Sequence, residues 1–328
     1  MKIAAYVGGL LGLALLIALV VRADFAAMLQ TLQAGGWRLL WLAPYRTLFF
    51  LLYAIGWRAL LSPSDPNRRA GLPYLVWVST VREAIDRLLP VASVGGGIVG
   101  VRLLRWRDLP TAPVAATVIV EILLTLVAAY LFTALGLLLL IPIGASGHEY
   151  RHMVLAFTLS LPVPAAMVLL LRYGSVFARL HGWLRALVGQ SATSDGAAQL
   201  DYELRACLRR GWSLLLAGSL QFAAFVSASF EIWFALRLFG HPVGARAALI
   251  LESMTQALRH LAFFIPGGIG VQEAALVLFG GALGISGELA LAVSMAKRLR
   301  EILCGLPSLL SWQWFEGRRL QRRMRNPS

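Results

Sequence analysis

The segment Phe263–Gly270, FFIPGGIG, places a proline and three glycines inside an otherwise apolar stretch. A second segment of this kind, Leu88–Gly100 (LLPVASVGGGIVG), lies earlier in the chain. Proline removes a backbone donor and glycine weakens a helix, so both segments predict breaks between two short helices. Irregular backbone at membrane depth is tolerated only where it is buried in protein or lines a water-filled cavity. The class of the fold therefore depends on what surrounds these two breaks.

The surrounding chain has the composition of a membrane protein. Its 328 residues are 59% hydrophobic and 14% charged, with a mean hydropathy of +0.72, whereas a soluble domain has about 25% charged residues. Charge-free windows cover Ile3–Val21, Ile122–Gly147, Met153–Leu171, Ser213–Phe230 and Ile302–Phe315. Most of them approach the roughly 20 residues that cross a bilayer as a helix. We expect an all-α, polytopic helical bundle, with residues 1–328 as a single transmembrane domain.

The charges predict the topology of this bundle. The chain has 30 Lys and Arg against 16 Asp and Glu, a net charge of +14. The arginines gather at span ends, in segment 172–210 and in the tail 311–328. The positive-inside rule makes that segment a basic cytoplasmic loop and the tail a basic cytoplasmic tail. Anionic lipid is a better explanation of these arginines than nucleic acid. The N-terminal apolar run is too long for a signal peptide, so we interpret it as a span that starts in the cytoplasm.

This topology predicts about six full spans and two re-entrant helical hairpins. Segments 72–107 and 246–284 contain the breaks, and each must begin and end on the same side of the membrane. Two tilted full crossings in each segment would satisfy the same charges, and that alternative stays open. The order span, hairpin, span occurs over 37–141 and again, inverted, over 211–310; Gly96–Arg102 aligns with Gly267–Glu273 with one gap. An inverted repeat with broken helices is the layout of many transporters.

Ionisable groups at membrane depth are functional candidates, because burying them there is costly. Glu252, Gln256 and Arg259 fall on one helix face before the second break. The predicted substrate-binding residues are Arg82, Arg102, Glu121, Glu252, Gln256, Arg259 and Glu273, and the break residues are Pro90, Gly95, Gly96, Gly97, Pro266, Gly267, Gly268 and Gly270. Arginine forks and free backbone N–H groups suit a lipid phosphate. The alternative is that these charges, with one-turn pairs such as Glu83–Arg87 and Lys297–Glu301, only hold the bundle together.

Two further patterns are weaker evidence of function: an H-E-x-x-H motif and tryptophans near the ends of spans. Residues His148–His152 spell H-E-x-x-H, the pattern of a zinc hydrolase. Zinc needs a third protein ligand, and no Asp or Glu occurs between Tyr150 and Asp195. A membrane zinc hydrolase therefore remains a remote alternative, and we expect no metal, cofactor or catalytic residue. Tryptophans near span ends predict an interfacial belt; they are Trp37, Trp57, Trp212 and Trp312.

The stretches Ala248–Ile285 and Leu289–Gln313 closely resemble the hopanoid-biosynthesis-associated HpnL-type membrane proteins. These proteins belong to the wider group that shares the membrane domain of lysylphosphatidylglycerol synthases, the MprF flippase domain. Pro266, Gly267, Gly268, Gly270 and Glu273 match the second-half element of this group, and Trp57–Leu61 and the glycine break with Arg102 look like its first half. The soluble aminoacyl-transferase domain of the synthases is not found here, so their enzymatic activity is not expected.

The resemblance implies that the protein moves a lipid between leaflets. Together with the charge-derived topology, it leads us to expect a protein of the bacterial inner membrane with both termini in the cytoplasm. Membrane lipids are the expected partners, and nucleic acid is not. The alternative is an accessory or scaffold protein for lipid biosynthesis, such as hopanoid assembly, with its enzymes docked on the basic loop and tail. Both hypotheses leave the lipid and the oligomeric state open.

Overall fold

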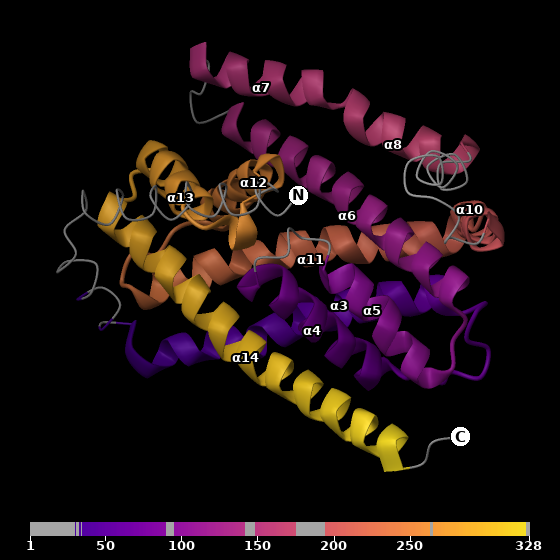
Figure 1. Cartoon of the computed structure of the whole chain (residues 1–328). Helices are drawn as coiled ribbons and strands as arrows, with labels where there is room; N and C mark the ends of the chain where they lie inside the picture. The colour runs from indigo at the N-terminus through magenta and orange to yellow at the C-terminus, as the bar shows by residue number, and fades with distance from the viewer. Residues whose placement is uncertain are drawn as a thin grey trace. The chain divides into compact units, whose positions relative to one another are not determined.

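The computed structural model describes residues 30, 33, 35–89, 95–141, 148–174, 194–262 and 265–325. These residues form helices joined by short turns, and no strand occurs among them (Figure 1). In chain order the elements are η1 (Gly36–Trp41), α3 (Leu42–Leu61), α4 (Leu72–Leu88), α5 (Gly95–Leu104), η2 (Arg105–Arg107), α6 (Thr111–Leu140), α7 (His148–Ser160), α8 (Pro162–Tyr173), α10 (Ser194–Leu208), α11 (Gly211–Leu238), α12 (Ala245–Leu261), η4 (Pro266–Gly268), α13 (Val271–Ala282) and α14 (Gly287–Arg325). The expected all-α class is confirmed.

Several helical stretches are long and apolar enough to cross a membrane. Within the described residues they are Gly36–Leu61, Thr111–Leu140, Tyr150–Tyr173 and Gly211–Leu238. The 30 residues of α6 extend about 45 Å at a rise of about 1.5 Å per residue. That length exceeds the hydrocarbon core of a bilayer, which is about 30 Å thick. The polytopic membrane bundle expected from the composition is confirmed.

Both broken segments consist of two short helices around an interruption. In the first, α4 ends at Leu88 and α5 begins at Gly95, whereas Pro90 lies outside the described residues. In the second, η4 lies between α12 and α13, which pack against each other. The longer leg in each segment, α4 or α12, has 17 residues and extends only about 25 Å. Legs of this length fit re-entrant hairpins; the re-entry itself and the inverted repeat stay predictions.

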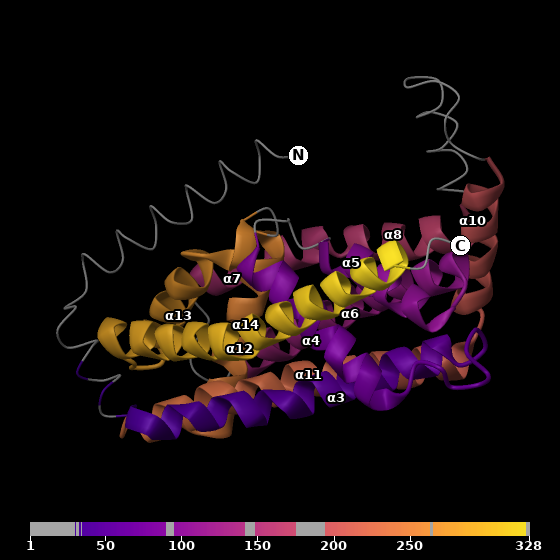
Figure 2. The same cartoon turned by 60° about the horizontal axis from the view of Figure 1, so that its bottom comes forward.

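Helix α14 is continuous from Gly287 to Arg325 and includes Pro307. Figure 2 shows it as one rod. The predicted last span and most of the basic tail are therefore one helix. Trp77 on α4 donates from Nε1 to Ser311 Oγ over 2.9 Å, and its ring lies edge-on to Phe315 with the centroids 5.6 Å apart. Four residues beyond Trp314, the Arg318 guanidinium stacks on the Trp314 ring at 3.6 Å.

The chain divides into two compact units, which are described separately. One comprises residues 1–50, 76–99 and 227–328, and the other comprises residues 51–75 and 100–226. The core of the second unit includes Leu60, Ala116, Val120, Leu123, Leu171, Leu204, Cys207 and Ala217. Leu204 and Cys207 belong to α10, so the last part of the predicted cytoplasmic loop 172–210 is a helix packed into this core.

Trp57 contradicts the expected interfacial belt. Its side chain is only 1% exposed, and its Nε1 donates to Thr117 Oγ1 over 3.1 Å. The reason is its position on the face of α3 that packs against α6. Trp37 and Trp212, in contrast, are largely exposed, as expected of belt residues.

The packing of α10 predicts an unreactive thiol at Cys207. Burial raises the pKa of Cys207 to about 11, which leaves about 0.1% thiolate at pH 8. In a Cys304→Ala variant, alkylation of Cys207 by iodoacetamide at pH 8 should be at least about a hundred times slower in folded than in denatured protein. Mass spectrometry of timed samples measures both rates, and raising the pH towards 11 should accelerate the folded-state reaction. Equal rates at pH 8 would contradict the packing of α10.

Candidate functional site

The second break is a left-handed glycine turn. Gly267, Gly268 and Gly270 have φ values of 62°, 60° and 80°, a region that residues with a β-carbon rarely adopt. A β-carbon on Gly267 would also lie 2.7 Å from the backbone oxygen of Arg87. The turn therefore requires glycine both for its conformation and for its close approach to the C-terminal end of α4.

Two arginines bind the carbonyl groups of this turn. Arg298 on α14 donates from Nη1 to Gly267 O over 2.8 Å and from Nη2 to Gly268 O over 3.1 Å. Arg259 on α12 donates from Nη1 to Gln272 Oε1 over 2.6 Å and from Nη2 to Gly267 O over 3.4 Å. Buried backbone carbonyl groups that have no hydrogen bond within a helix need other donors. The guanidinium groups of Arg298 and Arg259 are these donors.

Glu273 completes the break by capping α13. Its Oε2 accepts the Gly270 N–H over 2.8 Å, the arrangement in which a third-position glutamate reaches back to the N-cap. Its Oε1 accepts from Ser294 Oγ over 2.9 Å and from Arg298 Nε over 3.2 Å. This fully buried carboxylate is therefore bound on both oxygens, and in this conformation it holds the start of α13 in place.

Glu252 forms the most buried ion pair of the site. Its side chain is 1% exposed, and its Oε2 lies 2.6 Å from Lys297 Nζ on α14, itself 3% exposed. Gln256 lies one turn later on α12 and donates from Nε2 to Glu252 Oε1 over 2.8 Å. The shared helix face that the spacing of Glu252, Gln256 and Arg259 predicts is therefore directed at α13 and α14.

The first break is bound by a carboxylate instead of a guanidinium. Asp86 Oδ1 accepts the backbone N–H of Gly96 over 2.9 Å. A β-carbon on Gly96 would lie 2.5 Å from Arg82 O, so α5 begins in close contact with α4. Gly95 is the first residue of α5, and Gly97 is buried next to Gly96. The N–H groups at this helix start are thus partly occupied by the protein's own acidic residue.

The structure brings four of the predicted binding residues together around the second break: Glu252, Gln256, Arg259 and Glu273. Arg82 lies in the same unit, half-buried on α4. Arg102 and Glu121 belong to the other unit, where Arg102 is exposed on α5 and Glu121 is buried on α6. The backbone oxygen of Glu121 accepts from Gln221 Nε2 over 3.3 Å.

Sequence reasoning missed several members of this cluster. Arg300 Nε lies 2.6 Å from Glu231 Oε1 on α11, and Arg46 Nη2 on α3 lies 2.6 Å from Glu83 Oε1 on α4. The sequence signal was the run Lys297-Arg298-Leu299-Arg300-Glu301, which places four charges between two apolar stretches of α14. Its charged side chains contact α11, α12 and α13, so one short run of α14 connects three helices.

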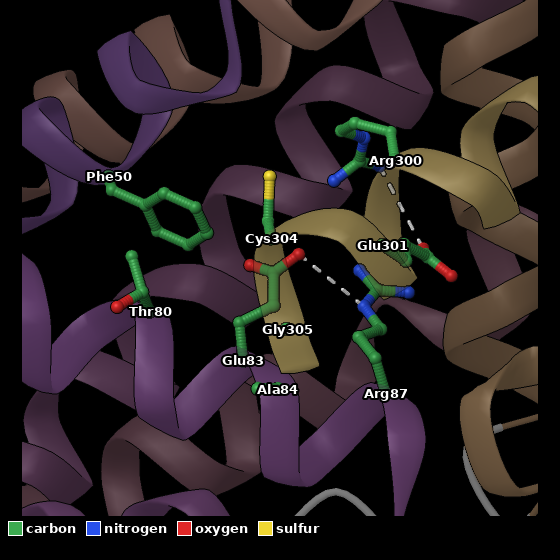
Figure 3. Close-up of a pocket in the computed structure, with 9 residues that line it drawn as sticks. All are labelled: Phe50, Thr80, Glu83, Ala84, Arg87, Arg300, Glu301, Cys304 and Gly305. Atoms are coloured by element: carbon green, nitrogen blue, oxygen red, sulfur yellow. Dashed lines mark ion pairs between the residues drawn. The ribbon is translucent and has the colours of Figure 1, made fainter. Parts of the chain in front are cut away.

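A pocket lies beside this run, between α3, α4 and α14 (Figure 3). Its lining residues are Phe50, Thr80, Glu83, Ala84, Arg87, Arg300, Glu301, Cys304 and Gly305. The view shows the side chains of Glu83, Arg87, Arg300 and Glu301 gathered on one side, and Phe50 on the other. Charged side chains of α4 and α14 therefore border a small pocket.

The zinc motif begins α7, where Tyr150 Oη donates to Leu137 O over 3.3 Å. No group of three or more His, Cys, Asp or Glu side chains that could hold a metal ion occurs in the part of the chain that the structure describes. The charged residues of the site pair instead as arginine or lysine with glutamate. Such a set binds polar or anionic groups directly through charge and hydrogen bonds.

An all-α bundle with apolar spans and a proline–glycine break surrounded by buried ion pairs defines a polytopic membrane protein of the broken-helix type. Residues 6–307 match the family described as the lysylphosphatidylglycerol synthase TM region, and the chain belongs to this family. No curated protein and no solved structure gave a match. The family resemblance expected from residues 248–313 is confirmed at this level, and it connects the protein with membrane lipids.

Proposed function

We propose that the protein moves a polar-headed or anionic lipid between the leaflets of the bacterial inner membrane, with the termini in the cytoplasm. The observation that supports this most is the buried ion cluster around the break. Removing two charges from water costs several kcal/mol per ion, and well-packed apolar residues hold a bundle equally well. Buried charges in a lipid-associated membrane family are better explained by a charged substrate than by stability.

The cluster offers exchangeable partners to a lipid headgroup. Arg259 binds a carbonyl and an amide oxygen, contacts that a phosphate oxygen can replace with a stronger charge-assisted bond. Glu252 and Lys297 would separate when a headgroup takes one of them. Arg82, Arg102 and Glu121 keep their proposed role as further headgroup contacts. The acyl chains would stay in the bilayer while the headgroup follows the polar side chains.

Lipid scrambling in liposomes tests this function. Purified protein is reconstituted with fluorescent phospholipid and hopanoid-like probes, and probe movement between leaflets is followed. Glu252→Gln and Arg259→Ala should slow movement about tenfold or more, a barrier increase of about 1.4 kcal/mol. Arg246→Gln, an exposed arginine at the start of α12, should retain the wild-type rate. Unchanged movement in folded Glu252→Gln and Arg259→Ala proteins would contradict the proposal.

The accessory or scaffold function in lipid or hopanoid biosynthesis is supported by one observation. Helix α14 continues to Arg325, and Arg318 is exposed on it, so the tail carries at least one exposed basic residue on a helix. The same liposome assay separates the two functions when the tail charges are neutralised by glutamine at Arg318, Arg319, Arg322, Arg323 and Arg325. If the protein is a flippase, the neutralised variant should still move lipid in liposomes. If it is a scaffold, the variant should lose the capture of lipid-synthesis enzymes.

Metal analysis of the purified protein tests the zinc hydrolase alternative.

A further inference from the structure

We propose that two turns of the second compact unit, α3–α4 and α5–α6, together form a docking surface for an anionic phospholipid. The surface consists of Arg68, Arg69, Arg105 and Arg107 and is called the arginine surface. None of these residues belongs to the ion cluster at the second break. The ligand is a lipid at the edge of the bundle whose phosphate meets these side chains, and its binding does not rest on the proposed transport.

Tyr74 joins the two turns. It lies near the start of α4, and its Oη donates to Leu103 O near the end of α5 over 2.7 Å. The guanidinium of Arg107 lies over the Tyr74 ring, 4.4 Å from the ring centroid. The other three arginines lie in the same two turns, which belong to one compact unit. Arginines from two separate segments of the chain therefore lie near the start of α4.

The four guanidinium groups are available to a ligand. All four side chains are exposed, and none forms an ion pair or hydrogen bond with another residue that the structure describes. Asp65 does not neutralise them, because it is buried and its two carboxylate oxygens accept the backbone N–H groups of Arg69 and Ala70, each over 2.8 Å. Asp108 is the exposed acidic residue of the α5–α6 turn. The surface therefore keeps an excess of positive charge.

Arg68 has a backbone conformation that favours glycine. Its φ is 52°, in the left-handed region that a β-carbon makes unfavourable. Non-glycine residues in this region are concentrated at functional sites, where the side chain compensates for the strain of the backbone. Because the Arg68 side chain is exposed and has no ion pair among the described residues, we infer that it serves a ligand outside the chain.

The position of the turns favours a lipid phosphate over a soluble anion or an acidic protein. The α3–α4 turn follows the candidate span Gly36–Leu61, and the α5–α6 turn precedes the candidate span Thr111–Leu140. Leu60 and Ala116 share one core cluster, so these two span ends lie at the same end of the unit. Half-buried Trp106, next to two of the arginines, is typical of a membrane interface. Arginines at that level attract the anionic lipids of the adjacent leaflet.

Native mass spectrometry of the intact protein in nonionic detergent tests the docking surface. Bound lipid is measured against the concentration of dioleoyl phosphatidylglycerol, dioleoyl phosphatidylcholine or glycerophosphoglycerol, the soluble headgroup. Phosphatidylglycerol should bind at least about tenfold more tightly than phosphatidylcholine. The triple variant Arg68→Gln, Arg69→Gln, Arg105→Gln keeps the backbone contacts of the turns, and it should lose about tenfold or more in affinity for phosphatidylglycerol alone.

The matched control removes the same charge from three other exposed arginines, as Arg151→Gln, Arg237→Gln, Arg246→Gln, and should keep the preference for phosphatidylglycerol. An equal loss of affinity in this control, or an unchanged affinity in the triple variant, would overturn the arginine surface. Glycerophosphoglycerol that binds as tightly as the lipid would overturn the lipid as its ligand. Failure of lipid scrambling would leave the result standing, because this binding needs no transport.

Arg68→Gly separates ligand binding from folding. Glycine relieves the left-handed backbone, so the variant should unfold thermally in detergent at or above the temperature of the wild type. Its affinity for phosphatidylglycerol should nevertheless fall about fivefold, the loss of one arginine at an anionic surface. A lower unfolding temperature with unchanged affinity would show that Arg68 serves the fold and would overturn its role as a lipid contact.

Discussion

Replacing Lys297 with methionine should destabilise the protein by about 3–5 kcal/mol, the usual loss when one partner of a buried ion pair is removed. The Lys297 ammonium and the Glu252 carboxylate lie 2.6 Å apart and are 3% and 1% exposed. Without Lys297 the carboxylate retains only the Gln256 amide as a partner and must remain as an uncompensated charge or take up a proton. Thermal unfolding in detergent, followed by circular dichroism, measures the loss.

The double variant Glu252→Met, Lys297→Met should recover most of this stability. Methionines of similar volume replace both charges and leave no ion unpaired, and such replacements are often neutral or stabilising. Arg318→Met on the exposed, later part of α14 is the control, and its expected change is at most about 1 kcal/mol, because it removes only an exposed cation–π contact with Trp314. A double variant as unstable as Lys297→Met would show that the ion pair stabilises the fold beyond compensating its own buried charges.

The double variant also separates stability from transport. If it folds well but moves lipid far more slowly than wild type, the buried charges serve the substrate. If it moves lipid at the wild-type rate, Glu252 and Lys297 serve only to hold α12 against α14. The second outcome would remove Glu252 from the proposed headgroup path and leave Arg259 to be tested alone.

The parts of the site that the sequence predicts are those governed by local chemistry. The positions of both breaks follow from proline and glycine, and the shared face of Glu252, Gln256 and Arg259 follows from helical spacing. Gln256 does reach Glu252 on that face. Which side chains form ion pairs between two helices cannot be predicted from spacing in this way, because it depends on how each helix is rotated about its axis. Lys297 and Glu301 are one turn apart on α14, yet Lys297 binds Glu252 on α12 and Glu301 lies among arginines.

Burial is likewise decided by tertiary packing. Trp57 and Trp212 both lie near span ends, but Trp57 is buried with its Nε1 bonded to Thr117 on α6, whereas Trp212 is exposed. The segment 172–210 has the composition of a polar loop, yet α10 buries Leu204 and Cys207. The burial of α10 depends on a few apolar residues at helical spacing. The polar residues around them make the segment look like a loop in the sequence. Arg46 was overlooked for the same reason, since its partner Glu83 lies on another helix.

Replacing Gly267 with alanine should cost about 2–5 kcal/mol, because two penalties act together. A left-handed backbone costs about 1–2 kcal/mol once a β-carbon is present. The new β-carbon would also lie 2.7 Å from Arg87 O, a backbone atom that cannot rotate away, and overpacking of this kind costs typically about 1–3 kcal/mol. The turn would shift and carry the carbonyls of Gly267 and Gly268 away from Arg298.

Two further alanine variants separate the two penalties. Gly96→Ala has no positive φ but places its β-carbon 2.5 Å from Arg82 O, so it should show the steric loss alone. Gly281→Ala on α13 meets no atom within 4 Å, and alanine should there stabilise by up to about 1 kcal/mol through helix propensity. Thermal unfolding should therefore rank stability as Gly281→Ala, wild type, Gly96→Ala and Gly267→Ala. A Gly267→Ala protein as stable as Gly281→Ala would show that the break does not need its glycine turn.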